Sequence, residues 1–237
     1  MKKITTILLI ILVLALIILL AFWLSKRTVT DAPGDTQTIT QTSITEQVIT
    51  EENFTGTRPV LSGSSTAVVA ANRYLDETIA AFRAQANQDV PDLRKQFGND
   101  APPSHYTLDF KAKIVTGENT QSIVIDGYRY TGGANGMSFY AVFTVNTTTN
   151  KLLGLTDIVS TDRQGAFTEY VKKAILAKQE GIFPESVTAL TFESFKNFSF
   201  TDDSLIIYFD KYEIGIGALG AVAFSLPLSD IGEFITV

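Results

Sequence analysis

The first hydrophobic pattern in the chain is an unbroken apolar run near the N-terminus. It extends from Ile4 to Leu24 without a charged residue. At ~1.5 Å per residue it forms a helix about 31 Å long, enough to cross a hydrocarbon core of ~30 Å. The run is longer than the apolar region of a cleavable signal peptide and lacks a small-residue cleavage site. We therefore expect residues 1–27 to form an uncleaved, single-pass anchor in the cell membrane, with the N-terminus inside and the rest of the chain extracytoplasmic.

The segment after this run is polar. Residues 28–57 are rich in Thr, Gln, Asp and Glu, and their apolar residues occur singly. Such a segment buries too little surface to offset the entropy lost on ordering. It is predicted to be a flexible Thr-rich stalk, although the alternation from Ile44 to Ile49 also suits an edge strand. Globular sequence begins near Arg58.

The remaining hydrophobic positions predict two helices and several strands. Apolar residues at spacings of three and four indicate an amphipathic helix from Ser65 to Ala86, with a serine at its N-cap. The next stretch, through Pro91, is predicted to be irregular. A second helix is predicted from Asp162 to near Gly181. Alternating apolar residues predict strands at 106–114, 122–130, 137–145, 195–200, 205–209 and 222–226.

The order of these elements predicts the fold class. Helices and strands occur in separate runs, which favours an α+β fold over a doubly wound parallel sheet. We expect antiparallel sheets packed with two main amphipathic helices, after the single transmembrane helix.

Composition and charge restrict the classes of partner. Of the 19 lysines and arginines, four lie at or before Arg27, whereas all 25 acidic residues follow it, so the rest carries 15 basic against 25 acidic side chains, a formal charge of −10. This charge repels phosphate backbones and argues against nucleic-acid binding. It favours encounters with cationic partners, or simply keeps the domain soluble. The chain has no cysteine, which excludes disulfides and thiolate chemistry.

Few residues could carry catalysis. His105 is the single histidine, so neither a zinc site nor a Ser-His-Asp triad is supported. No phosphate-binding glycine motif is present, and we expect no cofactor and no bound metal. The acids Asp202, Asp203, Asp210 and Glu213 could serve glycoside hydrolysis as a carboxylate pair. Asp202-Asp203 between two strands also suits a hairpin turn.

The segment Tyr130-Thr131-Gly132-Gly133-Ala134-Asn135-Gly136 lies between two predicted strands. Its glycines permit positive φ angles or a close approach of the backbone, and Asn135-Gly136 suits a type I′ hairpin turn. The segment is therefore either a special hairpin connection or a concave loop whose backbone amides meet a ligand.

This loop, with the segments Lys151 to Ile158, Phe198 to Ile214 and Leu226 to Leu228, resembles a bacterial extracytoplasmic family. The family includes the external domains of RsiV-like, lysozyme-responsive anti-sigma factors and the N-terminal region of PdaC-like peptidoglycan deacetylases. The resemblance covers about residues 58–234. It implies a PdaC-N-terminal-like subdomain at 58–150 and an RsiV-C-terminal-like subdomain at 151–237.

The resemblance implies a domain that binds at the cell envelope, with lysozyme or peptidoglycan as the partner types. Asn135 stands where the family usually has histidine, so a role of that imidazole is not expected here. No sigma-factor-binding domain precedes the predicted anchor and no deacetylase domain follows the last strand, so neither activity is expected of these residues.

We therefore expect a membrane-anchored, extracytoplasmic, non-enzymatic binding module that binds lysozyme or a peptidoglycan fragment. Exposed aromatics, among them Tyr212, could add to the glycine-rich loop as a binding patch. The alternatives are a glycan hydrolase that uses the paired carboxylates, and a structural envelope protein that self-associates through the anchor or a sheet edge. The expected ligand-binding residues are Tyr130, Gly132, Gly133, Asn135, Gly136 and Tyr212.

Overall fold

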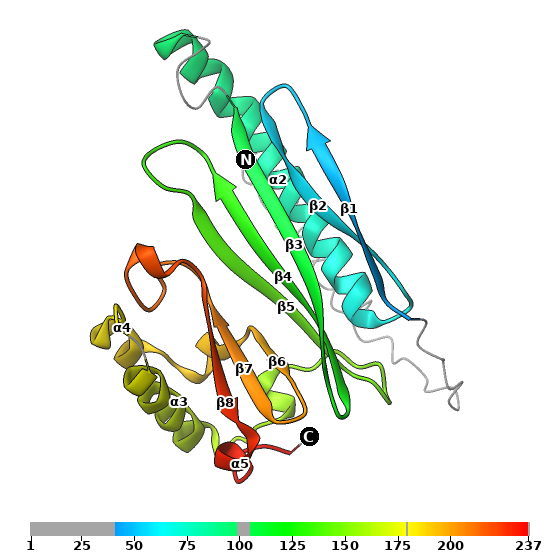
Figure 1. Ribbon diagram of the computed structural model, residues 1–237, viewed down its shortest axis with the longest axis vertical. Helices are drawn as coiled ribbons and strands as arrows, with labels where there is room; N and C mark the ends of the chain where they lie inside the picture. Colours follow the sequence, from blue (N-terminus) through cyan, green and yellow to red (C-terminus); the bar gives the residue numbers. More distant parts are fainter. Residues whose placement is uncertain (1–40, 99–104, 179, 237) are drawn as a thin grey trace, which may run out of the picture. The chain divides into compact units, whose positions relative to one another are not determined.

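The computed structural model describes residues 41–98, 105–178 and 180–236 (Figure 1). All of them lie in the second of two compact units of the chain, residues 39–237. The fold is α+β, as the sequence predicted, with a five-stranded sheet followed along the chain by a three-stranded sheet. Helix α2 covers the first sheet, and shorter helices accompany the second (Figure 1).

The five-stranded sheet has the order β1-β2-β3-β4-β5, so neighbours in the sequence are neighbours in the sheet. Three of its four pairings are antiparallel, in keeping with the prediction, and β4 pairs along almost its whole length with both β3 and β5. Its strands are β1 (Ser43–Thr50), β2 (Phe54–Ser62), β3 (Tyr106–Gly117), β4 (Thr120–Tyr130) and β5 (Met137–Asn146).

The pairing of β2 with β3 is parallel, which corrects the expectation of a purely antiparallel sheet. Helix α2 (Thr66–Phe97) connects these two strands, and a helical crossover returns the chain in the same direction. The predicted helix was too short, because α2 continues beyond Ala86 and contains Pro91. Its N-cap is Ser65, whose side chain accepts a hydrogen bond from the N–H of Ala67 at 3.2 Å.

The first two strands occupy part of the segment expected to be a stalk, residues 28–57. Residues 43–50 and 54–57 of this segment are strand, so the prediction of an edge strand from Ile44 to Ile49 is confirmed. The predicted anchor, residues 1–27, and the stalk up to residue 40 lie outside the described residues. Across the described ranges, no helix is both long enough and apolar enough to cross a membrane.

The core of the first sheet forms where the apolar side of α2 packs on it. Leu75, Ile79 and Phe82 of the helix are buried against strand residues such as Leu108 and Ile125. The sequence periodicity of three and four thus identified the correct buried side of the helix.

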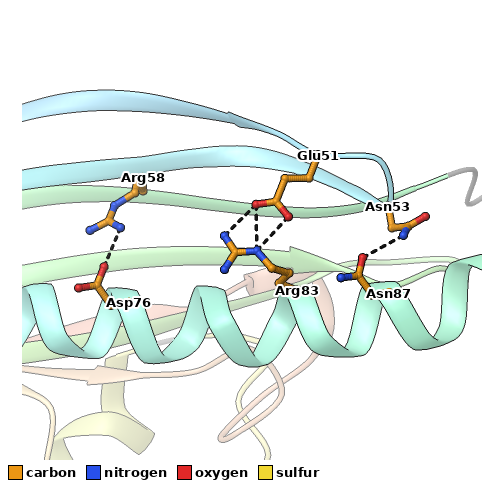
Figure 2. A network of polar contacts seen from close by, with 6 residues as sticks. All are labelled: Glu51, Asn53, Arg58, Asp76, Arg83 and Asn87. Carbon is orange, nitrogen blue, oxygen red and sulfur yellow. Dashed lines mark hydrogen bonds and ion pairs between the residues drawn. The ribbon is translucent and has the colours of Figure 1, made fainter.

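A row of polar contacts also connects α2 to the β1–β2 hairpin (Figure 2). Arg83 donates through Nε and Nη2 to the carboxylate of Glu51, at 2.8–3.0 Å. Asn53 Nδ2 donates to Asn87 Oδ1 at 2.9 Å, and Asn53 is only 7% exposed. These contacts fix the hairpin over the helix.

The second sheet has the antiparallel order β6-β7-β8. Its strands pack with the short helices around a second core that includes Phe167, Phe195 and Phe209. Helix α3 begins at Gln164, two residues later than predicted, and ends before Gly181, which has a φ of 84°. The remaining elements are η1 (Leu155–Asp157), α3 (Gln164–Lys178), α4 (Pro184–Ala189), η2 (Phe192–Phe195), β6 (Phe198–Phe200), β7 (Ser204–Phe209), η3 (Gly217–Leu219), β8 (Val222–Pro227) and α5 (Leu228–Ile231).

The second part of the chain binds the outer edge of β5. Asn197 Oδ1 accepts a hydrogen bond from Val142 N at 3.2 Å, and its Nδ2 donates to Tyr140 O at 3.1 Å. Asp210 Oδ1 accepts from Tyr140 N at 2.8 Å, and Lys211 N donates to Ser138 O at 3.0 Å. These contacts satisfy backbone groups of an edge strand that would otherwise be available for pairing with another chain.

Candidate functional site

A pocket of about 590 Å³ lies where α2, the β4–β5 end of the first sheet and the residues around β7 meet. This volume falls in the range of ~300–1,000 Å³ that is typical of small-molecule sites. Its lining combines aromatic, amide and charged side chains, so it can contact both faces and edges of a polar ligand. The lining residues are Tyr74, Thr78, Ala81, Phe82, Gln85, Leu108, Arg129, Met137, Phe139, Ser194, Lys196, Asn197, Tyr208, Asp210, Lys211 and Glu213.

One wall of the pocket is a stripe of α2 beside its buried face. Tyr74, Thr78 and Gln85 occur at helical spacing and line this wall. Thr78 Oγ1 donates to the carbonyl of Tyr74 at 2.7 Å, which orients the hydroxyl toward the helix. Burial raises the pKa of Tyr74, with Asp210 adding to the rise, so its phenol stays protonated and can donate a hydrogen bond.

The lining also includes residues of the turn from Asp210 to Glu213, in which Glu213 N donates to Asp210 O at 3.1 Å. One oxygen of the Asp210 carboxylate, Oδ1, accepts the hydrogen bond from Tyr140 N described above. Glu213 Oε2 accepts from Asp210 N at 2.8 Å. Burial raises the pKa of the Glu213 carboxyl, and the charge of Asp210 adds to this, whereas the Asp210 N–H and Lys196 oppose it.

Tyr212 occupies a rare backbone conformation within this turn. Its φ is 70°, a left-handed region that a bulky side chain seldom adopts. Tyr212 is 49% exposed, and its ring lies against Gly217, where a Cβ would come within 2.3 Å of it. Lys211 Nζ lies 5.0 Å from the centre of the ring. An exposed aromatic side chain held at such a cost is a feature often found at functional sites.

The glycine-rich loop between β4 and β5 lies beside this turn. Lys211 Nζ donates to the carbonyl of Gly136 at 2.8 Å, so it connects the loop to the Tyr212 ring. Within the loop, Tyr130 Oη donates to Gly133 O at 2.9 Å. The structure thus brings Gly136 and Tyr212 together, although they are far apart in the sequence.

The loop is not the type I′ turn that Asn135-Gly136 suggested. The positive φ angles occur at Gly132 (98°) and Gly133 (92°) instead. Asn135 is exposed in the connection. Gly136 has no room for a side chain, since a Cβ there would lie 2.2 Å from the ring of Tyr128.

None of the six residues expected to bind ligand lines the pocket itself. Tyr130, Gly136 and Tyr212 are sequence neighbours of the lining residues Arg129, Met137, Lys211 and Glu213. Sequence reasoning missed the wall on α2 and the cations, because no local pattern indicates which side chains from separate elements converge. A usable signal was the polar flank of the α2 stripe, where Thr78 and Gln85 follow Tyr74 at helical spacing.

The other candidate catalytic residues are not assembled into a site. Asp202 and Asp203 occupy the β6–β7 hairpin turn, as the turn reading predicted, with Thr201 Oγ1 donating to Asp203 Oδ1 at 2.7 Å. Hydrogen bonds from Thr201 and Ser204 lower the pKa of the Asp203 carboxyl. His105 is exposed just before β3. Over the described ranges, no group of three or more His, Asp or Glu side chains is placed to hold a metal ion.

Comparisons with known proteins match two consecutive parts of the chain. Residues 46–138 match the family described as "Deacetylase PdaC", and residues 156–229 match the "Protein of unknown function (DUF3298)". A curated relative, the peptidoglycan-N-acetylmuramic acid deacetylase PdaC of Bacillus subtilis, is 26% identical over 179 residues. This match covers 70% of the chain but only 37% of the length of that relative.

Two solved structures share the fold. A DUF3298 family member from Bacteroides fragilis superposes with a TM-score of 0.61 at 14% identity, covering 86% of this chain and 96% of that one. A DUF3298 family protein from Pseudomonas aeruginosa PAO1 gives 0.54 at 16% identity, covering 83% and 94%. The sequence resemblance is thus confirmed: the chain resembles the PdaC-like N-terminal region in its first half and the DUF3298 family of unknown function in its second.

Proposed function

We propose that this chain is a membrane-anchored, extracytoplasmic binding module of the bacterial cell envelope, and that it holds a peptidoglycan fragment in the pocket beside α2 without cleaving it. The observation that carries the proposal is the pocket of about 590 Å³, in which aromatic rings and amide side chains face one space. Sugars are bound by rings that cover their apolar faces and by planar polar groups that meet their hydroxyls. The named activity of the PdaC relative on peptidoglycan supports this choice of ligand.

The hydrogen bonds made by the candidate catalytic acids support ligand binding rather than glycoside hydrolysis. Glycoside hydrolysis needs one carboxyl as acid and a second as base or nucleophile, ~5–9.5 Å apart across the scissile bond. Asp202 and Asp203 satisfy a turn, and Asp210 accepts a backbone N–H of β5. In the pocket lining, Glu213 is accompanied by one further acid, Asp210, whose Oδ1 is held by the backbone of β5. We therefore expect Asp210 to stabilise the fold and Glu213 to position a sugar hydroxyl.

Calorimetric titration of the full chain in detergent with a disaccharide muropeptide tests the proposal. We expect saturable binding and no release of a cleaved product. Gln85→Ala, on the α2 wall, is expected to weaken binding about 5- to 10-fold through loss of a hydrogen bond. Gln47→Ala, on exposed β1, is the matched control and is expected to bind as the wild type does.

A substitution at Tyr212 tests whether its exposed ring contributes to ligand binding. Asparagine tolerates the left-handed conformation better than tyrosine, so Tyr212→Asn keeps the backbone and removes the ring. We expect weaker muropeptide binding with unchanged or slightly raised stability, which is the signature of a residue retained for binding. Unchanged affinity together with lowered stability would assign Tyr212 a structural role only.

Lysozyme is the alternative ligand, because the chain is acidic overall, with a formal charge of −6. Biolayer interferometry against lysozyme at two salt concentrations separates the possibilities. Saturable binding that weakens with salt, without muropeptide binding, would replace the pocket proposal by an acidic capture surface.

A structural role through self-association is a second candidate, because β1 is the outer strand of its sheet and Val48 is 69% exposed on it. An uncovered edge strand can pair with a second copy. Sedimentation at micromolar concentration as a monomer would count against this role.

A further inference from the structure

Arg129 and Lys196 approach the same pocket from two different elements. Arg129 is on β4, and Lys196 follows η2. Within the described part of the chain, neither side chain forms a hydrogen bond or an ion pair with another residue, and both are exposed. Both side chains can therefore donate to a negative group, while the charge of Lys196 also lowers the pKa of Glu213.

The pocket lining contains three cations, Arg129, Lys196 and Lys211, and two acids, Asp210 and Glu213, so its formal charge is +1. Asp210 Oδ1 accepts Tyr140 N, and Glu213 Oε2 accepts Asp210 N. The third cation, Lys211, is held by the carbonyl of Gly136. The lining therefore carries an excess of positive charge, in a chain whose formal charge is −6.

We propose that Arg129 and Lys196 form a carboxylate subsite, and that it receives a stem-peptide carboxylate of the muropeptide whose sugars lie against the aromatic and amide lining. The inference rests on the proposed function and specifies its ligand. A planar guanidinium binds a carboxylate through two parallel hydrogen bonds, and an ammonium adds a further charged donor.

The position of the subsite predicts a preference for a charged stem over a neutral glycan. Tyr74 and Gln85 on α2 line the same pocket as the two cations. A ligand that reaches both the α2 wall and the cations needs a sugar portion and an acidic appendage. A neutral chitooligosaccharide supplies only the first of these.

Four ligands measured by calorimetry with the full chain in detergent test the subsite. They are chitotetraose, the GlcNAc–MurNAc disaccharide, the same disaccharide with an L-Ala–D-Glu stem, and that stem with both carboxylates converted to amides. We expect the acidic-stem ligand to bind at least about 10-fold more tightly than its amide, since a hydrogen bond to a charged group contributes more than a neutral one. The plain disaccharide tests whether the lactyl carboxylate of the sugar is the source of the charge instead.

Variants then assign the effect to residues. Arg129→Gln and Lys196→Gln are each expected to reduce affinity for the acidic stem about 10-fold while leaving affinity for the amide unchanged. Arg129→Lys is expected to recover part of the loss, because it restores the charge but not the planar fork. Lys113→Gln, exposed on β3 and outside this pocket, is the matched control.

The outcomes separate this inference from the proposed function. Equal affinity for acid and amide, or no effect of Arg129→Gln, overturns the carboxylate subsite and leaves glycan binding intact. A preference for the plain disaccharide over the acidic stem overturns the assignment to the stem. Silence against all four ligands overturns both proposals.

Discussion

The carboxylate of Asp210 accepts a hydrogen bond from the backbone N–H of Tyr140 at 2.8 Å, across a sequence separation of 70 residues. This bond joins the turn after β7 to the outer edge of β5. The rings of Tyr140 and Tyr208 lie 5.0 Å apart beside it and reinforce the same junction. An acid that could have been read as catalytic therefore holds the two sheets together and places Lys211 and Glu213 in the pocket.

The side chain of Asn197 is predicted to be essential to this junction. It bonds both Val142 N and Tyr140 O on β5, so Asn197→Ala leaves two backbone groups of the edge without partners. We expect a loss of about 1–3 kcal/mol in the free energy of unfolding. Urea denaturation followed by circular dichroism measures it, with exposed Asn135→Ala as a control that should change stability by less than about 0.5 kcal/mol.

The parallel pairing of β2 with β3 predicts that a side chain at position 56 is not tolerated. A Cβ at this position would lie 1.7 Å from the carbonyl oxygen of Leu108, which is a backbone atom and cannot move aside. Gly56→Ala is expected to cost about 3 kcal/mol or to prevent folding. Gly165→Ala has nothing within 4 Å in helix α3 and is expected to raise stability by about 0.5–1 kcal/mol. Similar melting temperatures for the two variants would contradict the parallel pairing.

The polar contacts between the β1–β2 hairpin and α2 are expected to differ in strength. Asn53 is 7% exposed, and it donates to Asn87 and accepts from Arg94 Nη1 at 3.0 Å. Asn53→Ala should cost about 1–3 kcal/mol, because it leaves partly buried groups without a partner.

The ion pair of the same network supplies the comparison. The side chains of Arg83 and Glu51 are 44% and 31% exposed, so solvent screens their attraction and Arg83→Ala should cost at most about 1 kcal/mol. A larger loss for Arg83→Ala than for Asn53→Ala in chemical denaturation would refute this ranking.

Glu213 is predicted to make stability depend on pH. Because burial raises its pKa, the folded protein binds this proton more tightly than the unfolded chain does. Stability therefore falls as the pH rises from the unfolded pKa of ~4.3 through the higher folded value. Glu213→Gln, which can still accept the Asp210 N–H, should be more stable than the wild type above this window and equal to it below.

Asp203→Asn is the control of opposite sign. Hydrogen bonds from Thr201 and Ser204 lower the pKa of Asp203, so its contribution is present above the unfolded pKa of ~3.9 and is lost as the pH falls through the folded value. Denaturation curves recorded from pH 3 to pH 8, as an approximate working range, distinguish the two. A constant difference between Glu213→Gln and the wild type at every pH would contradict the raised pKa.

Local sequence patterns identified most of the elements correctly. The apolar spacing from Val68 to Phe82 specified the buried face of α2, and strict alternation placed β3, β4 and β5 within a few residues of their ends. The turn chemistry of Asp202-Asp203 was also readable. These features depend on neighbours within a few residues, and such neighbours are visible in a sequence.

Errors arose where distant contacts outweighed the local preference. Pro91 suggested a break, but packing of Val90 and its neighbours carries α2 through it. The Thr-rich segment from residue 43 looked too polar to order, yet pairing with β2 supplies its backbone hydrogen bonds. The helix between β2 and β3 allows the two strands to run in the same direction, and the sequence analysis did not predict this parallel pairing.

The sequence by itself determined the α+β class, the main helices and strands, and the resemblance to PdaC-like and DUF3298 proteins. Only the tertiary structure decided that Asp210 seals an edge strand, that Gly136 and Tyr212 meet through Lys211, and that Arg129 and Lys196 share a pocket. The physical reason is the distance along the sequence over which the contacts act. Periodicity records how a residue faces its own element, whereas a site forms from side chains that meet only after the elements have packed.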